Sequence, residues 1–188
     1  MTIKELFRAI LADIDKDKEM NHRQNSHRDY LRLFLLPQLA CLLIYRLSRY
    51  LFLKNFIIFS KLLRTLNVIL FSCDIQPEAN ILGGCFIGHT MGIVIGRQVE
   101  IDVGCIIFQG VTITPGTHPG EISSEPESLH IGKRVRIYAG AKIIGNLSIG
   151  SDVIIGANSV VLQSVPDGTT VVGIPARPII NTYSHLNR

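Results

Sequence analysis

Large aliphatic residues recur every six positions through most of the chain after residue 74. Because side chains alternate along a strand, the smaller residue two places before each of them faces the same way. The large series is Ile75, Ile81, Ile87, Ile95, Ile101, Ile107, Ile113, Ile131, Ile137, Ile143, Ile149, Ile155 and Val161. The small series is Ala79, Cys85, Val99, Cys105, Val111, Leu129, Val135, Ala141, Leu147, Val153 and Ser159. This period predicts a mainly β fold, a parallel β-helix of hexapeptide repeats.

The six-residue period is interrupted at two places. Between Ile87 and Ile95 the step is eight residues, so two extra residues are accommodated there, beside His89. The second interruption covers residues 114–128 and is rich in Pro, Gly, Ser and Glu, which is typical of a loop. Insertions in repeat proteins tend to lie on the binding face, so both interruptions are candidate parts of a functional site.

Residues 1–72 follow a helical period instead. Thr2 followed by Glu5 predicts a capping box at the start of the first helix. We expect two further helices over residues 29–53 and 55–71, with apolar faces buried on each other or on a neighbouring subunit. Charged residues interrupt this segment, so it has no uncharged run of about 18 residues that could cross a bilayer. The interrupting residues are Arg32, Arg46, Arg49, Lys54, Lys61 and Arg64.

The pattern therefore divides the chain into three predicted parts. An N-terminal helical region covers residues 1–72, and the β-helix covers residues 73–164 with the inserted loop 114–128. The period is lost over residues 165–188, where we expect a C-terminal cap and tail. A cap is expected because the open end of a coil is an unprotected sheet edge.

Composition limits the binding partners and the cellular compartment that we expect for the protein. Hydrophobic residues make up 47% and charged residues only 18%, which predicts that other subunits cover part of the surface. The net charge of +4 is too small to indicate nucleic acid. The four cysteines form no CxxC pair, which favours small buried side chains in a reducing cytoplasm. The N-terminus lacks an apolar signal segment, so we expect a cytoplasmic protein, and the basic, leucine-rich residues 29–71 could rest on the inner face of the membrane.

His89 is the candidate catalytic residue among the six histidines, because it lies at the break in the repeat. A histidine in a turn is ordinarily a surface residue, and that interpretation suffices for the others. His118 lies in the inserted loop and has no assigned role. The histidines and cysteines have no metal-ligand spacing, so the sequence predicts no metal site.

Several motifs of the repeat region resemble the serine acetyltransferase branch of the hexapeptide acyltransferases. They are "DIQPEANI", "FIGHTMGIVIG", "FQGVTI" and "AGAKIIGNLSIGSDVIIGANSVVLQSVPDGTTVVGIPAR". The resemblance implies a left-handed parallel β-helix that assembles as a homotrimer or a dimer of trimers. It also implies an enzyme that transfers acetyl directly from acetyl-CoA to an acceptor hydroxyl.

In that family a histidine and an aspartate fifteen residues earlier form the catalytic pair, and Asp74 and His89 have this spacing. The resemblance implies that His89 is the general base and that Asp74 orients its ring, although Asp74 could instead cap the first coil. It further implies that Ala139 and Ala157 line the acetyl-CoA groove between subunits, with Arg177 near its C-terminal end. Alanine also simply fits a turn, so both interpretations of these residues stay open.

The acceptor site departs from the family pattern. Serine-using members have an aspartate directly before the catalytic histidine and an arginine in the loop before the later coils. This chain has Gly88 at the first of these places, and Glu127 and Ser128 at the positions matched to the second. Serine carries an ammonium and a carboxylate, which these two charges would bind. We therefore expect a sugar or polysaccharide-precursor hydroxyl as the acceptor, with serine as the alternative. A third possibility is a non-catalytic solenoid that acts as a scaffold.

Overall fold

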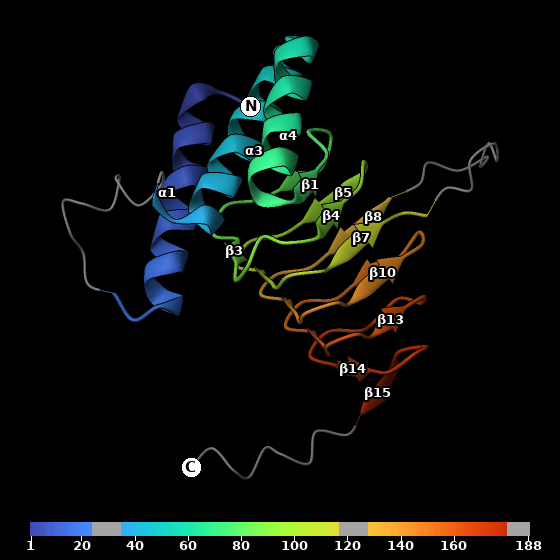
Figure 1. Cartoon of the computed structure of the whole chain (residues 1–188). Helices are drawn as coiled ribbons and strands as arrows, with labels where there is room; N and C mark the ends of the chain where they lie inside the picture. Colours follow the sequence, from blue (N-terminus) through green and yellow to red (C-terminus); the bar gives the residue numbers. More distant parts are fainter. Residues whose placement is uncertain (24–34, 117–127, 180–188) are drawn as a thin grey trace.

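In a computed structural model of the chain, the helices of the described residues gather at one end of a coil of short strands (Figure 1). The structure describes residues 1–23, 35–116 and 128–179. The helices are α1 (Ile3–Met20), α3 (Pro37–Leu53) and α4 (Ile57–Phe71). The expected capping box is present, because Thr2 Oγ1 accepts the Glu5 amide at 3.3 Å and Glu5 Oε2 accepts the Thr2 amide at 2.7 Å. The start of the helix expected over residues 29–53 and most of the loop 114–128, including His118, lie outside the described residues.

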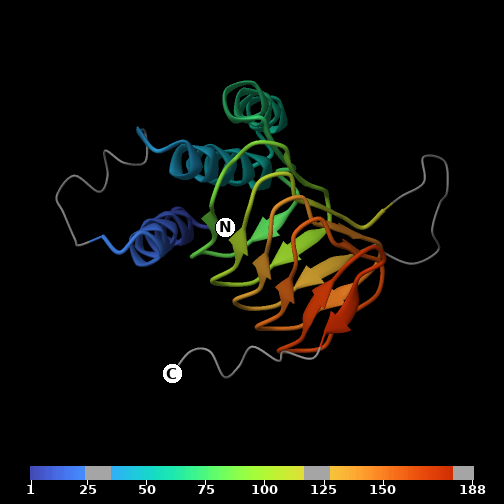
Figure 2. The same cartoon turned by 60° about the horizontal axis from the view of Figure 1, so that its bottom comes forward.

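Within the described residues, fifteen short strands wind into three flat faces. The first strands of each face are β1 (Cys73–Ile75), β2 (Asn80–Ile81) and β3 (Phe86–Ile87). The others are β4 (Ile93–Ile95), β5 (Val99–Ile101), β6 (Ile106–Ile107), β7 (Thr112–Thr114), β8 (Leu129–Ile131), β9 (Arg136–Ile137), β10 (Lys142–Ile144), β11 (Ser148–Ile149), β12 (Ile154–Ile155), β13 (Val160–Val161), β14 (Thr170–Val172) and β15 (Arg177–Ile179). From β1 to β13 every third strand joins the same sheet, so successive turns stack in parallel, as Figure 2 shows.

The large series and the small series form the core of the coil. Every member of the large series has at most 2% of its side chain exposed. The small series is buried as well, except Leu147, which is only partly buried. Each fully buried isoleucine contributes about 1.5–3 kcal/mol relative to an exposed one, so the stacked column stabilises the coil along its whole length.

The break in the repeat is visible as an enlarged corner. Gly88 and Gly92 stack on Phe108 and Gly110 of the next turn, because the Gly88 amide donates to Ile107 and Gly92 packs on Gly110. Three residues lie between the two glycines in the first turn, whereas only one residue lies between their partners. The two extra residues are therefore held at the corner between β3 and β4, and the core register resumes after them.

The helical region is fastened to the coil by a buried ion pair. Arg46 on α3 donates to both carboxylate oxygens of Asp13 on α1, at 3.0 and 3.1 Å, and also to the Ile81 carbonyl. Asp13 in turn accepts the backbone amides of Gly84 and Cys85 at 2.9 and 3.0 Å. Arg46 thus faces the coil and does not belong to a basic surface.

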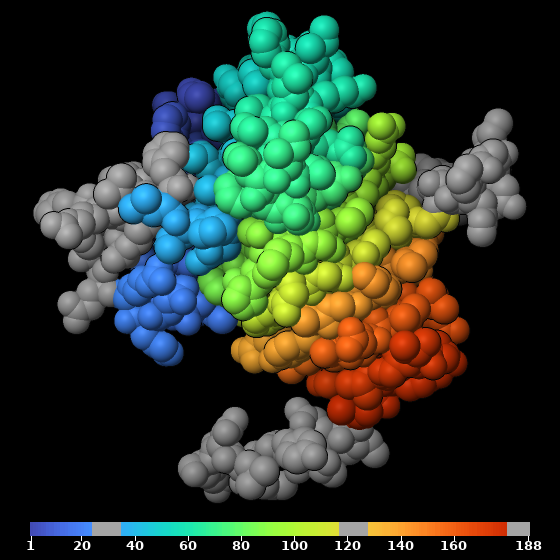
Figure 3. Space-filling view, viewed as in Figure 1, coloured from blue at the N-terminus to red at the C-terminus, as the bar shows by residue number. Residues whose placement is uncertain are grey.

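The outer helix α4 shows an unusually apolar surface. Figure 3 shows it on the outside of the molecule, above the first turns of the coil. Its exposed large side chains include Ile58, Phe59, Leu62, Leu66, Ile69 and Leu70. No helix within the described residues is both long enough and apolar enough to cross a membrane.

The C-terminal end of the coil is closed by a reversed strand. β14 continues the sheet in parallel with β12, and β15 pairs with β14 in the antiparallel direction. This last strand covers the edge that β14 would otherwise expose. Residues 180–188, the predicted tail, lie outside the described part of the chain.

Candidate active site

His89 lies exposed at the enlarged corner, beside a cavity of about 370 Å³. The cavity lies between the start of α3, the end of α4 and the corner itself. Its lining residues are Pro37, Gln38, Leu70, Phe71, Ser72, Gly88, His89, Thr90 and Met91. Within the described residues His89 has no hydrogen bond or ion pair, so both ring nitrogens are available to a bound molecule.

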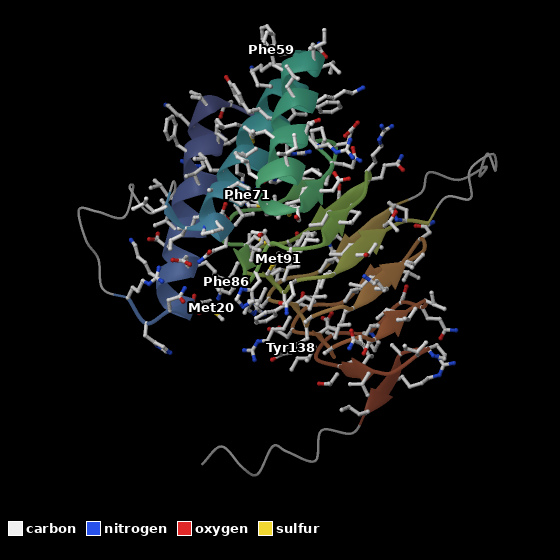
Figure 4. The ribbon with its side chains drawn as sticks, in the orientation of Figure 1. Met20, Phe59, Phe71, Phe86, Met91 and Tyr138 are labelled. Carbon is white, nitrogen blue, oxygen red and sulfur yellow. The ribbon has the colours of Figure 1, made fainter. Side chains whose placement is uncertain are left out.

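An aromatic pair occupies the space next to Gly88. A β-carbon at Gly88 would lie 2.6 Å from Cδ1 of Phe108, so the ring leaves no room for a side chain there. Phe108 stacks on Tyr138 of the following turn, with ring centroids 5.5 Å apart and planes within 3°. Figure 4 shows Phe71 and Met91 beside the corner and Tyr138 further along the coil. The rings extend an apolar surface away from the corner along the coil.

Asp74 lies on the outward face of β1, where its backbone is in register with Val94. Its carboxylate is held by Arg64 of α4, with Nε–Oδ1 at 2.6 Å and Nη2–Oδ2 at 2.7 Å. The described residues show no hydrogen bond between Asp74 and His89. The structure therefore places both residues in the first turns of the coil and gives Asp74 an arginine partner that the sequence did not suggest.

Ala139 and Ala157 lie on the same corner of the coil as His89. The amides of Gly110, Gly140 and Asn158 donate to the carbonyls of Met91, Gln109 and Ala139, respectively, at 2.8–2.9 Å. These bonds stack Met91, Gln109 and Ala139 in successive turns, with Ala157 in the turn after them. With about 4.8 Å between strands, the column runs roughly 14 Å from the His89 corner toward the C-terminal end. Small side chains keep the backbone accessible at its last two positions, Ala139 and Ala157.

Arg177 lies at the far end of the coil, exposed on β15. It lines a second cavity of about 220 Å³ with Leu162, Gln163 and Ala176 among others. Among the residues that the structure describes, its guanidinium donates only to the adjacent Ala176 carbonyl, at 3.4 Å. Arg177 is therefore free to bind an anion, and it lies beyond the turns that carry the two alanines.

The remaining candidates are accounted for structurally. All four cysteines are buried free thiols. His130 on β8 lies near Asp102, with Nε2–Oδ2 at 3.6 Å. Within the described residues no three His, Cys, Asp or Glu side chains cluster as metal ligands would.

Sequence reasoning missed two parts of this site, Arg64 and Phe108. Arg64 was noted only as a charge that interrupts an apolar helix, and nothing in the linear pattern pairs it with Asp74. In the turn after the break, Phe108 occupies the position that Gly88 occupies in the first turn. Aligning the two turns across the break would have identified it.

Comparison with known proteins places the chain in a family. The family profile "Bacterial transferase hexapeptide (six repeats)" matches residues 128–163. A serine acetyltransferase of Synechococcus elongatus is 36% identical over 175 residues, which are 93% of this chain and 69% of the relative. A serine acetyltransferase of Helicobacter pylori is 40% identical over 147 residues, which are 78% of this chain and 84% of the relative.

A solved structure gives the same assignment for the fold. The serine acetyltransferase of Brucella abortus, in complex with coenzyme A, matches with a TM-score of 0.82 and 31% identity. The match covers 94% of this chain and 68% of that one. The predicted fold, a left-handed parallel β-helix with N-terminal helices, is thereby confirmed. The chain belongs to the serine acetyltransferase branch of the hexapeptide-repeat acyltransferases.

Proposed function

We propose that the protein is an acetyl-CoA-dependent serine O-acetyltransferase in which His89 is the general base. The observation that carries this proposal is the enlarged corner, where His89, without a partner among the described residues, faces a cavity beside a column that ends in Ala139 and Ala157. The relatives' names supply the acetyl donor and the acceptor. The solved Brucella relative binds coenzyme A, and the curated relatives are named for serine.

The reaction is a direct transfer. His89 accepts the proton of the acceptor hydroxyl while that oxygen attacks the thioester carbonyl of acetyl-CoA. The C–S bond then breaks, and the imidazolium returns the proton to the CoA sulfur. Histidine suits both steps because its ordinary pKa lies near neutrality. Asp74 stabilises the imidazolium, Ala139 and Ala157 let the CoA arm approach the backbone, and Arg177 offers a cation to its phosphates.

A sugar hydroxyl remains a second candidate acceptor because of one observation. The Phe108 ring would have to shift to admit a side chain at position 88, and Gly88 itself offers no carboxylate to bind the ammonium of serine. The stacked Phe108 and Tyr138 rings instead offer an apolar face, on which the C–H surface of a sugar ring could lie. The sequence analysis preferred this acceptor, whereas the names of the relatives favour serine.

A transfer assay with product identification tests the proposed function. Purified protein is incubated with acetyl-CoA and either L-serine or a panel of hexoses and amino sugars. Free CoA is measured together with the mass of the acetylated product. O-acetylserine would support the main proposal, and an acetylated sugar formed without O-acetylserine would overturn it in favour of the second candidate. Neither product, combined with no binding of acetyl-CoA, would favour the scaffold interpretation.

We further propose that the active form is a homotrimer or a dimer of trimers. The cavity beside His89 is open on one side, and the alanine column lies on an outer corner of the coil. A neighbouring copy packed along this corner would convert the column into a groove. The exposed apolar surface of α4 at the same end of the molecule supports such an assembly.

A further inference from the structure

Two helices bring ends of opposite partial charge to the cavity beside His89. Pro37 and Gln38, the first residues of α3, line this cavity. So do Leu70 and Phe71, the last residues of α4. A helix carries a partial positive charge at its N-terminus and a partial negative charge at its C-terminus. The cavity therefore has both signs of charge available, although none of the described residues that line it has a permanently charged side chain.

Nothing in α3 itself neutralises its N-terminus. The N-cap residue Leu36 makes no side-chain capping bond, and the first turn contains no acidic residue. Pro37 has no amide hydrogen, and the Ala40 amide is the one that donates to the Leu36 carbonyl. The amides of Gln38 and Leu39 have no acceptor among the described residues, so both can donate to an anion.

A buried hydroxyl gives a second, independent indication of a ligand in the same cavity. Thr90 follows His89 at the corner, lines the cavity and is only 7% exposed. Its hydroxyl has no hydrogen-bond partner in the part of the chain that the structure describes. A hydroxyl is rarely buried without a partner, because it loses the hydrogen bonds that it makes with water. A bound molecule that accepts the proton of this hydroxyl would restore one of them.

The end of α4 offers acceptors where the start of α3 offers donors. The Ser72 amide closes the last turn on the Val68 carbonyl. The carbonyls of Leu70 and Phe71 accept no hydrogen bond from the described residues, and the last turn contains no basic residue. A cation such as an ammonium is the group that a helix C-terminus favours.

We propose that this cavity binds the acceptor as an amino-acid zwitterion, an inference that rests on the proposed function and assigns the subsite of its acceptor. The carboxylate accepts hydrogen bonds from the amides at the start of α3 and from the Thr90 hydroxyl. The ammonium donates to the carbonyls at the end of α4, and the acceptor hydroxyl is left to His89. A cavity of about 370 Å³ is large enough for a free amino acid.

The two helix ends thus replace the two charged side chains that the sequence lacks at the family's positions. Gly88 stands where an aspartate would bind the ammonium, and Glu127 and Ser128 stand where an arginine would bind the carboxylate. A neutral sugar would leave both helix ends without a counter-charge. The inference therefore also separates the two candidate acceptors of the proposed function.

Analogues of serine that lack one charged group test the assignment. The value of kcat/KM for acetyl transfer is measured with L-serine, with ethanolamine, which lacks the carboxylate, and with 3-hydroxypropionate, which lacks the ammonium. Each analogue should be worse than L-serine by about tenfold to a hundredfold, because hydrogen bonds to a charged group are lost. Ethanolamine as good as L-serine would overturn the carboxylate subsite, and 3-hydroxypropionate as good as L-serine would overturn the ammonium subsite.

Two substitutions connect the carboxylate to named residues. Gln38→Glu places a negative charge at the start of α3, where it repels the carboxylate, and Thr90→Val removes the hydroxyl but keeps the shape. Each should lower kcat/KM for L-serine about tenfold without lowering it for ethanolamine. Gln98→Glu and Thr65→Val are matched controls, because both residues are exposed and lie outside the cavity lining. Unchanged serine-to-ethanolamine ratios in Gln38→Glu and Thr90→Val would overturn the proposal.

An NMR titration separates this inference from the proposed function. The amide signals of Gln38 and Leu39 should shift with L-serine and with 3-hydroxypropionate, and much less with ethanolamine, whether or not acetyl is transferred. Such shifts in a protein that forms no O-acetylserine would refute the function and keep the subsite. O-acetylserine formed without these shifts would refute the subsite and keep the function.

Circular dichroism melting of each variant identifies a loss of folding. If Thr90→Val does not fold, Gln38→Glu decides alone. That substitution is compatible with the fold, because Gln38 is half-buried in the first turn of α3, where a carboxylate is favoured. A folded Gln38→Glu protein with the wild-type preference for L-serine over ethanolamine would then contradict the proposal.

Discussion

At the scale of single residues, glycine is required at position 88 by the lack of room for a side chain and not by backbone conformation. Its φ is not in the left-handed region, but a β-carbon would lie 2.6 and 2.7 Å from two carbons of the Phe108 ring. That ring is held in turn by stacking on Tyr138. The residue next to the proposed base thus depends on a side chain one turn further along the coil.

We expect Gly88→Ala to destabilise the protein by about 1–3 kcal/mol through overpacking against Phe108. In a Phe108→Ala background the same substitution should cost much less, because the colliding ring is gone. Urea unfolding of the four proteins at one fixed concentration measures this coupling. Equal costs in both backgrounds would show that Phe108 does not determine residue 88.

The sequence predicted the parts of the site that the repeat itself encodes. The eight-residue step between Ile87 and Ile95 located the corner, whereas Ala139 and Ala157 were named from the family resemblance. Arg64 and Phe108 could not be assigned in this way. Their contacts depend on how α4 turns into β1 and on which residues stack across turns of unequal length.

At the scale of elements, a buried ion pair joins α1 and α3 to the coil. Arg46 and Asp13 are almost fully buried, and together they bond to four backbone groups of residues 81–85. Another Arg–Asp pair, Arg134–Asp152, is also bidentate but lies exposed on the coil. The sequence analysis named Arg46 only as one of the charges that interrupt the apolar segment, because its partner Asp13 lies on a different helix.

We expect Arg46→Met to lower the free energy of unfolding by about 3–5 kcal/mol, because it leaves the Asp13 carboxylate buried without its partner. Arg134→Met is the matched control and should cost far less, since water replaces its exposed contacts. Thermal and urea unfolding of both variants measure the difference. Similar losses in the two variants would contradict the view that the buried pair fastens the helices to the coil.

At the scale of the whole molecule, α4 carries an apolar row suited to another helix. Phe59, Leu62, Leu66 and Ile69 follow one another at steps of three, four and three residues, and all four are exposed. This spacing is the seam along which helices pack. The assembly proposed above would place a second copy of the chain against this row.

We expect Leu62→Glu to lower the molar mass measured by light scattering, because a carboxylate in the seam would be desolvated without a partner. The neighbouring Lys61→Glu changes charge outside the seam and should leave the mass unchanged. A Leu62→Glu protein of wild-type mass would contradict the helix contact. If that protein also lost binding to anionic vesicles, the row would instead be a membrane-contacting surface.

The central claim, that His89 is the base of an acetyl transfer, is tested most directly by comparing two histidine substitutions. His89→Ala should lower kcat about 10²–10⁴-fold while the affinity for acetyl-CoA holds, because a positioned base contributes a factor of that size. His130→Ala, at an exposed histidine on another face of the coil, should turn over at nearly the wild-type rate. A His89→Ala enzyme as fast as the wild type would contradict the account.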